Sequence, residues 1–174
     1  VLLIDGARRV GKSYIVAEFA KNEYDSHILI DFNKVSNDIK GLFENYLDDL
    51  DTFFSYLSAF FNVRLSPGKS LIVFDEVQQY PKARAALKYL VADGRFHYIE
   101  TGSLMSIKAN TEGIVIPSEE RHISMYPLDF EEFLWAVGNE TMMPFIEDCY
   151  CAMRPLGQAM HRKVMDFFRQ YLLI

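Results

Sequence analysis

Short runs of apolar residues, bounded by polar or turn-forming residues, recur along this chain and predict buried strands. The run Ser26–Phe32, for example, is flanked by Asp25 and Asn33, which is typical of a strand covered on both faces. The expected strands cover residues 1–5, 26–32, 70–75, 95–101 and 121–126.

Between these runs the apolar positions change to helical spacing. Pro81 fits the start of one helix and Gly94 its end. A short helix over 103–109 and a loop over 111–120 are also expected. Strands that alternate with helices favour an α/β fold with a parallel sheet, in which ligands bind beyond the carboxyl ends of the strands. The main expected helices cover residues 11–21, 38–44, 48–62 and 82–93.

The last part of the chain lacks strand patterns and is expected to be helical. Residues 127–135 turn into a helix with Asp129 as its N-cap, and two more helices follow Gly138 with a break near residues 155–157. We therefore divide the chain into a core over 1–136 and a helical extension over 137–174. The first residue already lies in a strand and the last residues lie inside a helical pattern, so we expect a piece of a longer protein.

The first strand leads into a glycine-rich segment that matches G-x-x-x-x-G-K-[ST], the phosphate-binding P-loop. Glycines let the backbone fold around an anion, and the following helix adds the positive end of its dipole. Lys12 can reach the β- and γ-phosphates, and the Ser13 hydroxyl can bind Mg²⁺. Arg8 and Arg9 are expected to project away from the phosphates. The predicted nucleotide-binding residues are Gly6, Ala7, Arg8, Arg9, Val10, Gly11, Lys12, Ser13 and Tyr14.

Two further strands end in polar residues that suit nucleotide chemistry. Asp75 ends the third strand and is predicted to hold Mg²⁺, directly or through water. Glu76 follows it and has the reach to orient or deprotonate an attacking water. The fourth strand ends in Thr101-Gly102-Ser103, where a hydroxyl can sense the γ-phosphate; an N-cap role for Ser103 is the alternative.

Composition narrows the classes of function. The chain has 174 residues, of which 50% are hydrophobic and 24% charged, as in an ordinary globular domain. A net charge of −6 does not indicate nucleic-acid binding, which needs clustered basic residues. No run has the length of a membrane-spanning helix. Cys149 and Cys151 lack the spacing of a metal site, so reduced thiols and a cytoplasmic location are expected.

The motif set resembles the AAA-family ATPases of bacteria and archaea that carry an uncharacterised C-terminal domain. Asp75-Glu76-Val-Gln-Gln-Tyr-Pro81, Thr101-Gly102-Ser103 and Tyr126-Pro-Leu-Asp-Phe-Glu-Glu-Phe-Leu134 carry the resemblance. The chain departs from the family pattern at Glu120, where glycine is usual, and at Asp129, where serine is usual.

The resemblance implies a P-loop NTPase three-layer sandwich whose parallel sheet has the strand order 5-1-4-3-2. It implies ATP and Mg²⁺ as ligands, a missing C-terminal domain as partner, and assembly with a partner protein or into a homo-oligomer. Catalytic roles fall on Glu76, Lys12, Ser103 and Arg121. An arginine at position 121 could reach a γ-phosphate in its own site or a neighbour's, or form an ion pair with Glu119 or Glu120.

The sequence is compatible with two functions. The first is a Mg²⁺-dependent ATPase, favoured by Glu76. The second is a nucleotide-gated switch of the STAND type, which would use the bound state to hold or release other domains with little turnover. A small-molecule kinase is disfavoured by the Asp75–Glu76 pair and by the lack of an arginine-rich lid. A GTPase is disfavoured because no base-reading N/T-K-x-D motif is present.

Overall fold

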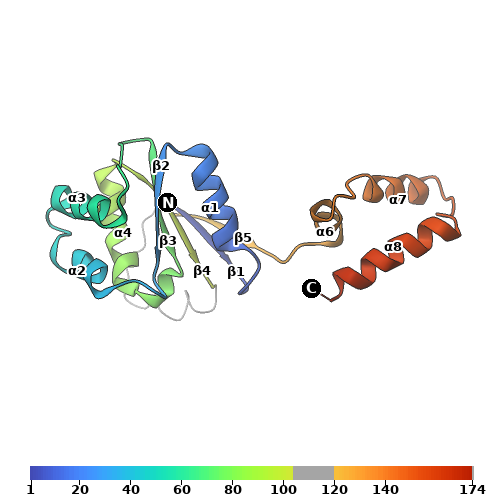
Figure 1. Cartoon of the computed structure of the whole chain (residues 1–174), viewed down its shortest axis with the longest axis horizontal. Coiled ribbons are helices and arrows are strands. Elements are labelled where there is room, and N and C mark those ends of the chain that lie inside the picture. Colours follow the sequence, from blue (N-terminus) through green and yellow to red (C-terminus); the bar gives the residue numbers. More distant parts are fainter. Residues whose placement is uncertain (104–119, 174) are drawn as a thin grey trace. The chain divides into compact units, whose positions relative to one another are not determined.

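The computed structural model describes residues 1–103 and 120–173 (Figure 1). Its sheet is parallel with the order β2-β3-β4-β1-β5, which confirms the predicted arrangement. The expected helix over 103–109 and loop over 111–120 fall almost wholly outside the described residues. The strands are β1 (Leu2–Gly6), β2 (Ser26–Asp31), β3 (Ser70–Asp75), β4 (His97–Gly102) and β5 (Arg121–Met125).

Helices cover both faces of this sheet, as Figure 1 shows. On one face, α1 (Lys12–Glu23) packs through Val16 and Ala20 onto β3 and β4. On the other face lies a larger apolar cluster that includes Phe53, Phe74 and Leu87. That cluster is covered by α2 (Asn37–Asn45), α3 (Leu50–Phe61) and α4 (Pro81–Asp93). The expected three-layer sandwich is therefore confirmed.

The register of the strands brings their carboxyl ends to a common edge. Asp5 in β1 pairs with Gly102 in β4, and Asp31 in β2 pairs with Asp75 in β3. All six residues of β3 are buried, so the strand that ends in Asp75 is a fixed support inside the sheet, between β2 and β4. The functional segments predicted from the sequence leave the sheet at this edge.

Residues 127–174 form a second compact unit, and residues 1–126 form the first. The second unit contains α6 (Phe130–Ala136), α7 (Met142–Cys151) and α8 (Gln158–Tyr171). Asp129 caps α6 in a reciprocal capping box with Glu132, which confirms the predicted N-cap. The division at residue 137 stays a prediction. Among the described residues, none of the helices has the length and apolar character needed to traverse a bilayer.

A small cluster of ionisable side chains lies on the α4 face of the sheet. Arg84 of α4 lies 3.4 Å through Nε from Oε2 of Glu100, and 3.1 Å through Nη2 from Oε2 of Glu120. Glu100 is fully buried. Burial raises the pKa of Glu100 to about 8, the nearby charge of Arg84 opposes this rise, and Glu120 adds to it.

Glu100→Gln should remove a pH dependence from the free energy of unfolding. The folded protein keeps a proton on Glu100 between its ordinary pKa of 4.5 and about 8, whereas the unfolded chain releases it. Wild-type stability should therefore fall as pH rises through this range, by up to about 1.4 kcal/mol per pH unit from this group. Urea unfolding at pH 5 to 8 tests this expectation.

As pH rises from 5 to 8, the free energy of unfolding of Glu100→Gln should increase relative to that of wild type. Glu23→Gln, at an exposed position at the end of α1, is the matched control. Stability curves of Glu100→Gln and wild type that run parallel from pH 5 to 8 would contradict the expectation.

Candidate functional site

The P-loop occupies the turn between β1 and α1. Gly6 has φ 151° and Gly11 has φ 95°, while Arg9 also has a positive φ of 67°. A Cβ on Gly6 would lie 2.1 Å from the carbonyl oxygen of Met125 in β5. Only glycine therefore fits at position 6, and the loop leaves the sheet as a tight turn.

Lys12 is the first residue of α1, and its side chain folds back over the loop. Its Nζ donates hydrogen bonds to the carbonyl oxygens of Gly6 at 3.1 Å and Ala7 at 2.7 Å. The side chain is buried, with 4% of the residue exposed. The ammonium group thus lies within the turn where the P-loop pattern predicts phosphate.

The hydroxyl of Ser13 meets the carboxylate of Asp75 beside the lysine. Ser13 Oγ donates to Asp75 Oδ1 at 2.8 Å, although the two residues are 62 positions apart. The hydroxyl of Thr101, from the end of β4, donates to the same carboxylate oxygen. Hydroxyl and carboxylate oxygens are ligands that Mg²⁺ prefers, so Ser13 and Asp75 form a donor set that suits this ion.

Glu76 follows Asp75 in the left-handed backbone region, with φ 55° and ψ 46°. Its backbone N–H donates to Thr101 Oγ1 at 3.2 Å. Its side-chain Oε2 accepts a hydrogen bond of 2.6 Å from Nε2 of Gln78. Gln78 belongs to the short helix η1 (Val77–Gln79). The carboxylate therefore has a defined position next to the Asp75–Thr101 pair.

The structure thus brings four of the predicted residues to one edge of the sheet, and it adds two that were not among them. The predicted residues are Lys12, Ser13, Asp75 and Glu76, and the additional residues are Thr101 and Gln78. Thr101 belongs to the strand-end motif Thr101-Gly102-Ser103, from which the sequence predicts Ser103 as the functional hydroxyl. Ser103 directly follows β4, and its predicted role stays a prediction.

Gly6, Ala7, Val10 and Gly11 belong to the loop itself, whereas four other predicted residues lie farther out. Arg8, Arg9 and Tyr14 are exposed around the loop. Arg121 begins β5 and pairs with Leu2, whereas the P-loop begins at Gly6, four positions later in the register. At about 3.3 Å per residue, this separation is roughly 13 Å along the strand.

Arg121 therefore lies at the opposite edge of the sheet from Asp75, and the structure does not bring it to its own P-loop. A role in a neighbouring molecule's site stays a prediction. The Glu120 carboxylate contacts Arg84. Glu119, the other expected partner of Arg121, lies outside the described residues.

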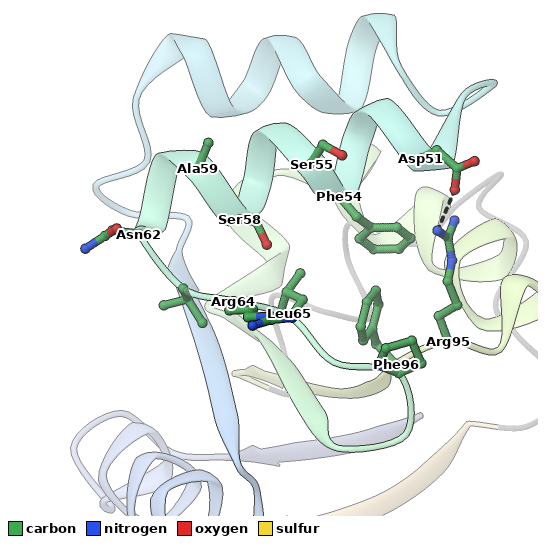
Figure 2. A pocket seen from close by; sticks show the side chains of 12 residues that line it. Asp51, Phe54, Ser55, Ser58, Ala59, Asn62, Arg64, Leu65, Arg95 and Phe96 are labelled. Atoms are coloured by element: carbon green, nitrogen blue, oxygen red, sulfur yellow. Dashed lines mark hydrogen bonds and ion pairs between the residues drawn. The ribbon is translucent and has the colours of Figure 1, made fainter.

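A groove of about 840 Å³ opens near the amino ends of β3 and β4 (Figure 2). It lies between α3 and the segments that precede β3 and β4. Arg95 crosses one end, where its Nη1 lies 2.6 Å from Asp51 Oδ1 and its guanidinium lies 4.8 Å from the ring centroid of Phe54. The Arg95 guanidinium is therefore held by an ion pair with Asp51 and a contact with the Phe54 ring.

Comparison with known proteins agrees with the geometry of the P-loop edge. A family model described as an AAA domain matches residues 1–134. No curated protein matches this chain.

Two solved structures share a distant likeness. The structure of C. elegans PCH-2 has a TM-score of 0.42 and 9% identity, over 87% of this chain and 39% of that one. The crystal structure of a DNA replication initiation factor has a TM-score of 0.38 and 11% identity, over 99% of this chain and 54% of that one. This chain therefore spans about 39% to 54% of the length of these two structures.

The match of the family model covers most of the chain and includes every residue of the P-loop edge described above. On this evidence the chain belongs to the AAA domain family.

Proposed function

We propose that this chain binds ATP together with Mg²⁺ and hydrolyses it. The observation that carries the proposal is the meeting of Ser13, Asp75 and Thr101 beside the buried Lys12. These groups come from three separate segments of the chain. Their arrangement combines a cation for phosphate with oxygen ligands for a divalent metal.

The P-loop would hold the phosphates. Lys12 Nζ, which contacts the Gly6 and Ala7 carbonyls, would donate instead to phosphate oxygens, since it carries three donor hydrogens. The amino end of α1 adds favourable electrostatics for an anion. These contacts support binding of a nucleoside triphosphate at the turn between β1 and α1.

Ser13 and Asp75 would hold Mg²⁺, which supplies neutralisation of phosphate charge when bound. The Asp75 carboxylate is fixed by hydrogen bonds from the Ser13 and Thr101 hydroxyls. Glu76 would accept a proton from the attacking water and orient it toward the γ-phosphate. Most of the catalytic effect would then come from positioning and electrostatics.

Phosphate release from ATP should be measurable with Mg²⁺ and should stop when EDTA removes it. Binding of a fluorescent ATP analogue in the same buffers separates affinity from turnover. Tight binding with no phosphate release would contradict hydrolysis and support the nucleotide-gated switch. Absence of binding in either buffer would contradict the proposal as a whole.

A further inference from the structure

Gln78 contacts the carboxylate that the proposed hydrolysis requires, although it is neither a P-loop residue nor a predicted metal ligand. Gln78 is only 5% exposed, and its side-chain Nε2 lies 2.6 Å from Glu76 Oε2. An amide N–H that donates to a carboxylate is a charge-assisted hydrogen bond, which is shorter and stronger than one between neutral groups. A short bond from a buried donor restricts where this carboxylate can lie.

The backbone of Glu76 is held as well. Its N–H donates to Thr101 Oγ1 at 3.2 Å. Its left-handed backbone, with φ 55°, turns the chain away from the direction of β3. A glutamate side chain has three rotatable bonds and would otherwise sample several rotamers. Thr101 thus holds the backbone of Glu76, and Gln78 holds the carboxylate at the end of its side chain.

The bond from Gln78 engages one oxygen of the carboxylate. Among the described residues, Oε2 of Glu76 accepts a hydrogen bond and Oε1 accepts none, so Oε1 keeps its lone pairs for a water proton. We propose that Gln78 is a positioning residue for ATP hydrolysis, which holds Oε2 of Glu76 so that Oε1 faces the attacking water. This inference rests on the proposed ATPase function.

Gln78→Met tests the inference, because methionine has nearly the same length and shape but no amide donor. Gln79→Met is the matched control, since Gln79 is the next residue of η1 and is exposed. We expect Gln78→Met to lower kcat about 10- to 100-fold, the range for loss of catalytic positioning. The KM for ATP should stay within about twofold, because Lys12 and the P-loop are intact. Gln79→Met should match wild type.

A double variant distinguishes positioning of Glu76 from a general effect on the fold. In a Glu76→Gln background, Gln78→Met should cause no further loss of the residual single-turnover rate, since the carboxylate it positions is gone. A further loss of tenfold or more in that background would overturn the inference.

Gln78→Leu provides a second variant if Gln78→Met does not fold by circular dichroism. It also lacks a hydrogen-bond donor and fills a similar volume with an apolar side chain, so it should lose at least as much turnover. An active wild type with an equally active Gln78→Met or Gln78→Leu overturns the role of Gln78. A wild type that binds ATP without turnover overturns the ATPase proposal instead.

Discussion

Glu76→Gln should leave ATP binding close to that of wild type and lower turnover by about 10²- to 10⁴-fold, the usual contribution of a general base. Glutamine keeps the length of the side chain but cannot accept a proton from water at neutral pH. The Ser13–Asp75 and Lys12 contacts do not involve the Glu76 side chain, so the phosphate and metal ligands stay in place. Phosphate release under saturating ATP measures the effect on kcat.

The control for this experiment is Glu18→Gln, which changes a half-exposed carboxylate on α1. It should retain the wild-type rate. Turnover of Glu76→Gln within threefold of wild type would show that another group activates the water. A loss of ATP affinity equal to the loss of kcat would assign Glu76 to binding instead.

Lys12→Ala should lower ATP affinity by about 100-fold or more. Loss of hydrogen bonds from an ammonium to phosphate costs roughly 1.5 to 3 kcal/mol for each contact, and tenfold in affinity corresponds to about 1.4 kcal/mol. The substitution also leaves the Gly6 and Ala7 carbonyls without the donor that spans the loop. That second loss affects the free protein, in which the ammonium contacts these carbonyls, so the expected weakening of binding comes from the lost phosphate contacts.

Lys21→Ala is the matched control for Lys12→Ala, since it removes a lysine from the other end of α1 whose side chain is 70% exposed. Titration with a fluorescent ATP analogue compares the two variants with wild type. Circular dichroism checks that α1 remains folded. Affinity of Lys12→Ala within twofold of wild type would contradict the placement of phosphate at this loop.

The fold was predictable because apolar runs and a P-loop are local signals. The five strands lie within two residues of their expected bounds. The largest difference is at β4, expected from Arg95 but beginning at His97. Arg95 pairs with Asp93 and Asp51 instead of extending the strand, and this preference depends on tertiary contacts.

The site was predictable only in part. Ser13 and Asp75 could be placed together because the P-loop leaves β1, and β3 ends in Asp75, at the same edge of a parallel sheet. The selection of Thr101 over Ser103 required knowledge of which hydroxyl faces Asp75. The contact of Gln78 with Glu76 depends on η1 and on the left-handed Glu76, and no periodic pattern indicates either.

Arg121 shows that the order of motifs along the chain does not by itself give the position of a residue in the fold. The resemblance allowed this arginine to reach a γ-phosphate in its own site or a neighbour's, or to form an ion pair, and the register pairs it with Leu2, at the amino end of β1. The site lies where the parallel strands end, whereas Arg121 stands where its strand begins. The order of motifs along the sequence does not show this difference unless the direction of each strand is considered.

The close approach of Met125 to Gly6 changes how the P-loop pattern should be used to recognise relatives. The β5 carbonyl excludes a side chain at position 6 whether or not a phosphate is bound. A relative that had lost nucleotide binding would still need glycine there to keep β1 paired with β5. In a survey of degenerate homologues, Lys12 and Ser13 are therefore the informative markers of retained binding, and the first glycine reports only that the fold persists.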